Sequence, residues 1–167
     1  MALFAQLLHS ARAAPRLARA ARAQGLSARE SATSLHIAVA ALRVATERGR
    51  GIRGRINAVR HFVWQSLLTA HFSASVAERL GEVHEEGTPH AEDSRVDLHN
   101  NAVGRAYGES HAAELAATSV GSAADRAAQA ALTAWEEGDL IWVDSLRRQQ
   151  RAQRRRRRRK AQRRGQA

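Results

Sequence analysis

The sequence predicts an all-α fold, a small helical bundle with basic extensions at both ends. Ala, Arg, Leu, Glu and Gln, which favour helices, dominate the chain, and aromatic residues make up only 4% of it. Apolar residues recur at intervals of three and four, and no segment alternates as a half-buried strand would. The chain has no cysteine, which excludes disulfides and thiolate metal ligands.

Charge divides the 167 residues into three parts. The net charge is +11, but residues 1–50 carry +6, residues 51–146 carry −7 and residues 147–164 carry +12. The basic ends, rather than the acidic middle, are therefore the candidates for contact with anionic partners. We expect a basic amphipathic arm, a helical domain and a disordered or helical Arg-rich tail, over residues 1–26, 27–146 and 147–167.

The first helix is expected from about Leu3 to Gln24, ending before Gly25. It is amphipathic, Arg-rich and free of acids, which is typical of a mitochondrial transit peptide or of a helix in peripheral contact with a membrane. A GC-rich bacterial genome also produces such an Ala- and Arg-rich composition. We therefore predict a bacterial cytoplasmic protein, with a mitochondrial or an exported effector protein as alternatives. No apolar run approaches the roughly 20 residues that cross a bilayer, so no transmembrane segment is predicted.

The second helix should begin at a capping box, in which Ser27 is followed three residues later by Glu30, and should reach Glu47. Three glycines alternate with arginines over residues 48–55 and predict a flexible basic hinge. The third helix should then run without a break from about Ile56 into residues 78–86. One of its faces carries polar, aromatic and apolar side chains at helical spacing, namely Asn57, His61, Trp64, Leu68 and His71.

After a loop that ends near Asp93, Ser94 is expected to cap the fourth helix. Gly104 and Gly108 lie one turn apart on this helix and cost about 2 kcal/mol of helix propensity relative to alanine. This cost predicts that another helix packs closely there, which would press two polar faces into one site. The core should end near Leu146, after a break at Gly138 and a last short helix.

The tail contains an unbroken basic run without an apolar face, formed by Arg154, Arg155, Arg156, Arg157, Arg158, Arg159 and Lys160. Such a run binds nucleic acid or another polyanion nonspecifically, through counterion release. The alternatives are a tail that only solubilises the chain and a tail that folds back on the acidic middle.

Three motifs follow one another along the domain: N-A-V-R-H-F-V-W over residues 57–64, His84-Glu85, and D-L-H-N-N-A-V-G-R over residues 97–105. Over about residues 52–146 the chain resembles an uncharacterised bacterial helical domain family with the patterns N-A-x-R-H-x-x-W, His-Glu and D-x-x-N-N-x-x-G-R. The resemblance implies a domain of unknown function, often near the C-terminus of secreted or toxin-like proteins. The matching positions are Asn57, Arg60, His61, Trp64, His84, Glu85, Asp97, Asn100, Asn101, Gly104 and Arg105.

These residue types suit a hydrolase-like or effector-type site. A histidine would be the general base, a carboxylate would orient it or bind a metal, and an asparagine would donate to a developing oxyanion. The catalytic candidates are His61, His84, Glu85, Asp97, Asn100 and Asn101, and the binding candidates are Asn57, Arg60, Trp64 and Arg105. The chain has no nucleophile elbow, zincin motif or phosphate loop. An HNH-type nuclease is disfavoured because it needs a β-hairpin.

Two other interpretations stay open. A metal site is permitted but not required, with zinc favoured over other divalent ions by imidazole ligands; its candidates are His71, His84, His90, Asp97 and His111, with Glu78 or Glu85. Alternatively, the polar faces only lock the packing of the helices. The domain would then be a non-catalytic module whose tail binds nucleic acid.

Overall fold

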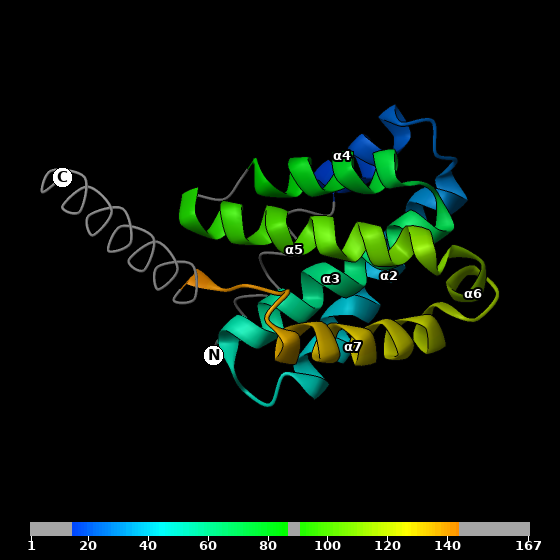
Figure 1. Ribbon diagram of the computed structural model, residues 1–167. Coiled ribbons are helices and arrows are strands. Elements are labelled where there is room, and N and C mark those ends of the chain that lie inside the picture. The colour runs from blue at the N-terminus through cyan, green and yellow to red at the C-terminus, as the bar shows by residue number, and fades with distance from the viewer. Residues whose placement is uncertain (1–14, 87–90, 144–167) are drawn as a thin grey trace, which may run out of the picture.

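The computed structural model describes residues 15–86 and 91–143, and every regular element within these ranges is a helix (Figure 1). The elements are α2 (Ala28–Arg48), α3 (Arg53–His71), α4 (Ala74–Glu85), α5 (Ala91–Ser110), α6 (Ala112–Ala116) and α7 (Val120–Glu137), and residues 15–23 are also helical. The all-α prediction is confirmed. Among the described helices, none combines the length and the apolar character that crossing a membrane requires.

Helix α3 is the central element of the bundle. It packs against α2, α4, α5, α6 and α7, and its residues 61–69 are all buried. A helix that is enclosed by neighbours buries every face, including the face that carries polar side chains. The polar side chains of α3 must therefore find partners inside the protein.

Helices α3 and α5 lie side by side and run parallel (Figure 1). The same offset of 40 residues joins them at three successive levels, in the pairs Asn57 with Asp97, His61 with Asn101, and Gln65 with Arg105. Along each helix, successive members of these pairs are four residues apart and so share one helix face. Only parallel helices in register keep a constant offset over three levels.

The close approach predicted from Gly104 and Gly108 is confirmed. A Cβ on Gly104 would lie 2.5 Å from the backbone oxygen of Phe62, and one on Gly108 would lie 2.5 Å from the backbone oxygen of Ser66. The Ser66 hydroxyl donates to the backbone oxygens of Phe62 and Gly104, at 2.7 and 3.0 Å. The two glycines therefore let the backbones of α3 and α5 touch.

The expected continuous third helix is wrong, because α3 ends at His71 and a separate helix, α4, begins at Ala74. Phe72 leaves the helical conformation, with φ −127° and ψ −80°, and the Ser73 side chain caps α4 by accepting from the backbone N–H of Val76. The chain reverses at this break, so that α4 packs back along α3 and α5. The end of α4 thereby reaches the middle of α3.

Two further expectations at helix ends are also wrong. Helix α5 begins at Ala91, before the expected cap at Ser94, and the Asp97 carboxylate pairs with α3. Residues 49–52 form a tight turn rather than a flexible hinge: Gly51 has a φ of 74°, and a Cβ on Gly49 would clash with Ile56. Helices α2 and α3 pack against each other across this turn.

Other boundaries agree with the sequence. The capping box of Ser27 and Glu30 starts α2. Gly25 and Gly138 have φ values of 85° and 86° and end their helices in the left-handed conformation that glycine favours. Leu17 is 8% exposed and belongs to the core, so the described end of the predicted arm packs on the helical domain.

Candidate functional site

A row of polar side chains lies where α3 meets α5, on the side that α4 covers. We call it the polar seam, and it consists of Asn57, His61 and Gln65 of α3 with Asp97, Asn101 and Arg105 of α5. His61, Gln65 and Asn101 are fully buried, and Asp97 is 7% exposed. Burying such groups is costly unless each has a partner. Their pairing therefore decides what the seam can do.

The first level of the seam is a charged network. The Asn57 amide donates to the Asp97 carboxylate, and Arg60 Nη2 donates to Asn57 Oδ1 at 2.9 Å. The same Arg60 nitrogen lies 2.6 Å from His61 Nε2, and Asp97 Oδ2 lies 3.3 Å from that ring nitrogen. His61 Nε2 is therefore placed between a cation and an anion.

Asn101 fixes the ring of His61. Its side-chain oxygen lies 2.9 Å from His61 Nδ1, and an amide oxygen can only accept, so Nδ1 carries a proton. The assignment of oxygen and nitrogen in Asn101 follows this network. Nε2 then faces both Arg60, from which an unprotonated ring nitrogen accepts, and the Asp97 carboxylate.

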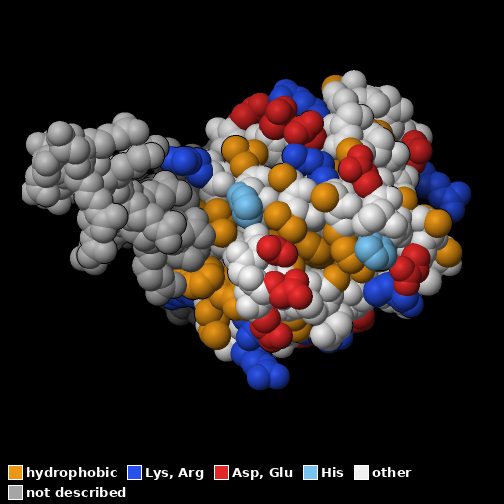
Figure 2. Space-filling model, in the orientation of Figure 1, with side chains coloured by type: hydrophobic (Ala, Val, Ile, Leu, Met, Phe, Trp, Pro, Cys, Tyr) orange, Lys and Arg blue, Asp and Glu red, His pale blue; other side chains and the backbone are white. Residues whose placement is uncertain are grey.

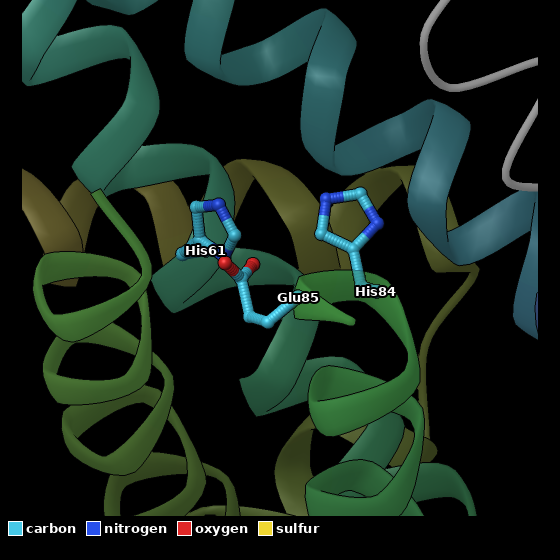
Figure 3. Close-up of side chains that lie close together, drawn as sticks. All are labelled: His61, His84 and Glu85. Atoms are coloured by element: carbon cyan, nitrogen blue, oxygen red, sulfur yellow. The ribbon is translucent and has the colours of Figure 1, made fainter. Parts of the chain in front are cut away.

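Helix α4 brings His84 and Glu85 to the same place. Figure 3 shows the Glu85 carboxylate pointing toward the His61 ring, with the His84 ring beside it. The ring centres of His61 and His84 are 5.8 Å apart, and Trp64 packs edge-on against His84 at 5.3 Å. One potential ligand atom from each of His61, His84 and Glu85 lies within 4.8 Å of the others. These three residues could hold a metal ion.

The pKa values of the two carboxylates of the site are shifted in opposite directions. Burial, then the nearby Asp97 charge, raises the pKa of Glu85, against the opposing effects of His61, Ser94 and Arg60. Ser94 lowers this pKa although neither Glu85 oxygen has a hydrogen bond of normal geometry. Burial would also raise the pKa of Asp97, but His61, followed by Arg60 and Asn57, lowers it below its ordinary value. The pKa values of two acids in one site are thereby driven apart.

Arg60 carries the positive charge nearest to His61 and the two carboxylates. Burial lowers its pKa, and the charges of Asp97 and Glu85 oppose that effect. The guanidinium is enclosed although the residue as a whole, like Asn57, is only half-buried. Both ends of the seam therefore reach toward the solvent, since Arg105 at the other end is also half-buried.

The far end of the seam contains Gln65, which the sequence analysis missed. Arg105 donates to Gln65 Oε1 at 3.3 Å and to Glu78 of α4 at 2.9 Å. The side-chain nitrogens of Gln65 and Asn101 have no hydrogen-bond partner and face Gly81, where a Cβ would lie 3.2 and 3.1 Å from them. Gln65 stands four residues after His61, and this spacing is the signal that could have identified it.

Several predicted residues lie elsewhere. Asn100 hydrogen-bonds the backbone N–H and C=O of Ile141, each at 3.0 Å, so its amide serves the segment after α7. His71 lies ten residues after His61, about 15 Å along the helix axis, and His111 stacks on Tyr107 with ring centres 4.0 Å apart. His90 and the basic run of the tail, with its proposed binding of nucleic acid, lie outside the described residues.

On the face seen in Figure 2, the described residues form no large patch of a single charge. Arginines are scattered there among small groups of Asp and Glu side chains and apolar patches, within the described part of the chain. This face therefore lacks the continuous basic surface that a nucleic-acid interface would present.

Comparison with known proteins places the site inside a family. No curated protein and no solved structure matches the chain. A family model matches residues 26–132, which begins before the span of 52–146 expected from the motifs and ends within α7. The match includes the polar seam, His84 and Glu85. The chain belongs to the family described as "Domain of unknown function (DUF6973)".

Proposed function

We propose that this domain is a hydrolase in which the buried pair of His61 and Asp97 activates the attacking water. The observation that carries the proposal is the position of His61 Nε2, 3.3 Å from Asp97 Oδ2, while Asn101 holds the opposite ring nitrogen. Because Nδ1 is bonded to Asn101, Nε2 is the nitrogen that would take the proton of the water once Arg60 turns away, and the Asp97 carboxylate beside it would stabilise the imidazolium that forms. The sequence motifs supply all three residues.

Arg60 supports this chemistry with positive charge. Hydrolysis of esters, amides and phosphodiesters develops negative charge on oxygen, and a fixed donor in an enclosed site stabilises it more strongly than water does. Arg60 Nη2 is within 2.6 Å of His61 Nε2 and is held by Asn57, so that it flanks the proposed base. Asn57 and Arg60, beside the proposed base, are half-buried, and we propose that substrate enters from their side.

Hydrolysis by the full chain tests the proposal, with a panel of ester, amide and phosphodiester substrates. The variant Asp97→Asn keeps the size of the side chain and an acceptor for Asn57. Loss of the base function should lower the rate by roughly 10²- to 10⁴-fold without loss of the fold. The control is Asp125→Asn, because Asp125 is a half-exposed acid of α7 that pairs with Arg43 and Arg48 of α2 and not with the seam.

The competing interpretation, a seam that only locks helix packing, gives a different result. In that case His61→Ala would leave buried partners without hydrogen bonds and lower the free energy of unfolding by a few kcal/mol. The wild-type chain would then hydrolyse none of the substrates. A wild-type rate that Asp97→Asn leaves unchanged would also refute the roles assigned here.

A further inference from the structure

We propose that His61, His84 and Glu85 bind one divalent cation, and that their chemistry favours Zn²⁺. The proposal goes beyond the proposed function, because a cation on His61 Nε2 takes the nitrogen that serves there as the base, so the two roles belong to different states of the site. His84 and Glu85 lie beside the seam and have no part in the hydrolase roles. Two imidazoles and one carboxylate are a ligand set typical of zinc, whereas magnesium and calcium prefer oxygen ligands alone.

The geometry brings the ligands within reach of one ion. One ligand atom of each residue lies within 4.8 Å of the others, and the Glu85 carboxylate is turned toward His61 (Figure 3). Tetrahedral bonds of about 2.0–2.1 Å require ligand atoms about 3.3 Å apart. Rotations of the side chains that move each ligand atom by an ångström or so close this difference. His84 and Glu85 are on the last turn of α4.

The balance of buried charge favours a cation. Glu85 is 9% exposed, and neither of its oxygens has a hydrogen bond of normal geometry. Asp97 adds a second carboxylate to the site, while Arg60 supplies a single guanidinium that is shared by both. Buried charges are normally paired or bound to metal. A cation at Glu85 would supply a positive charge to compensate this buried carboxylate.

The bond between His61 and Asn101 matches the outer shell of a metal site. A histidine that binds a metal usually donates its other ring N–H to a carbonyl or carboxylate oxygen, which fixes the ring. His61 Nδ1 makes such a bond with Asn101 Oδ1 at 2.9 Å and leaves Nε2 for the cation. His61 and Asn101 lie on different helices, so the packing of α3 against α5 sets the direction in which His61 Nε2 points.

Arg60 is the competitor for this position. Its Nη2 lies 2.6 Å from His61 Nε2 and must turn away when a cation binds there. Its positive charge also opposes a second cation at short range. Removal of the guanidinium should therefore strengthen cation binding. Loss of a residue that served only to stabilise the fold would not have this effect.

Titration of the full chain with ZnCl₂, after treatment with a chelator, tests the inference by calorimetry. We expect one ion per chain, with binding lost in His84→Ala and Glu85→Gln and weakened roughly 10- to 100-fold in Asn101→Ala. Glu82→Gln is the matched control, because Glu82 is an exposed acid on the same helix. Arg60→Gln should bind Zn²⁺ more tightly than the wild type. Circular dichroism establishes that each variant is folded.

The results separate this inference from the proposed function. Failure of the folded wild type to bind Zn²⁺, or equal binding by wild type and Glu85→Gln, overturns the metal site. Hydrolysis that persists after chelation, with no Zn²⁺ bound, overturns any requirement of the reaction for the ion and supports the base of His61 and Asp97. One bound ion that depends on His84 and Glu85, without hydrolysis of any substrate, supports the metal site and refutes the hydrolase.

Discussion

Gly104→Ala is expected to destabilise the protein although alanine is the better helix former. The added Cβ would lie 2.5 Å from the backbone oxygen of Phe62 and 2.9 Å from its Cα. Backbone atoms of a central helix cannot rotate away as a side chain can, so α3 and α5 must separate. Overpacking of this kind costs about 1–3 kcal/mol, and we expect the upper end of that range. The gain in helix propensity is about 1 kcal/mol, so the net loss should be about 2 kcal/mol.

Urea unfolding followed by circular dichroism measures this loss as a difference in the free energy of unfolding. Gly121→Ala in α7 is the control, because the nearest atom to its Cβ, the Ser119 hydroxyl oxygen, would be 3.9 Å away. Free of contacts, that substitution should be neutral or should stabilise the protein by up to about 1 kcal/mol. If Gly104→Ala proved as stable as the wild type, close backbone contact could not be the reason for the glycine.

Two further predictions concern the segment after α7 and the dependence of stability on pH. Asn100→Ala removes both hydrogen bonds to the Ile141 backbone and should cost about 1–3 kcal/mol, with faster hydrogen exchange at Ile141; unchanged exchange would contradict the tether. Burial lowers the pKa of His71, so the folded state favours the neutral ring. The unfolded chain then binds a proton first, and stability is lost as the pH falls from about 6.5 through the lower, folded pKa. Unfolding of His71→Gln between pH 7 and 5 should show a flatter decline, and an identical decline would exclude His71.

The sequence predicted the parts of the fold that depend on local chemistry. The capping box at Ser27 and the left-handed glycines at Gly25 and Gly138 act within one turn of chain, so spacing alone identifies them. The glycines of α5 also implied a close helix contact. The expected partner, the helix face that carries His61 and Trp64, is the one found. The parallel register with α3 depends on contacts 40 residues apart, for which helical spacing holds no information.

The site was predicted where its residues share a helix face. His61, Asp97 and Asn101 were selected by periodicity, and the structure brings them together. Asn100 was selected by its place in a motif, but one position along a helix turns a side chain by about 100°, away from the seam. The roles of these residues in catalysis or metal binding stay predictions that the experiments above test.

The break at Phe72 and Ser73 is what gives the His-Glu motif its place in the site. His84 follows His61 by 23 residues, so in the continuous helix that composition favours they would be about 35 Å apart. The reversal into α4 instead brings their rings to 5.8 Å. The Ser73 cap that starts α4 is a single hydroxyl, too weak a signal to outweigh an otherwise helical pattern. A short segment without chemistry of its own therefore determines whether the histidines can share a cation.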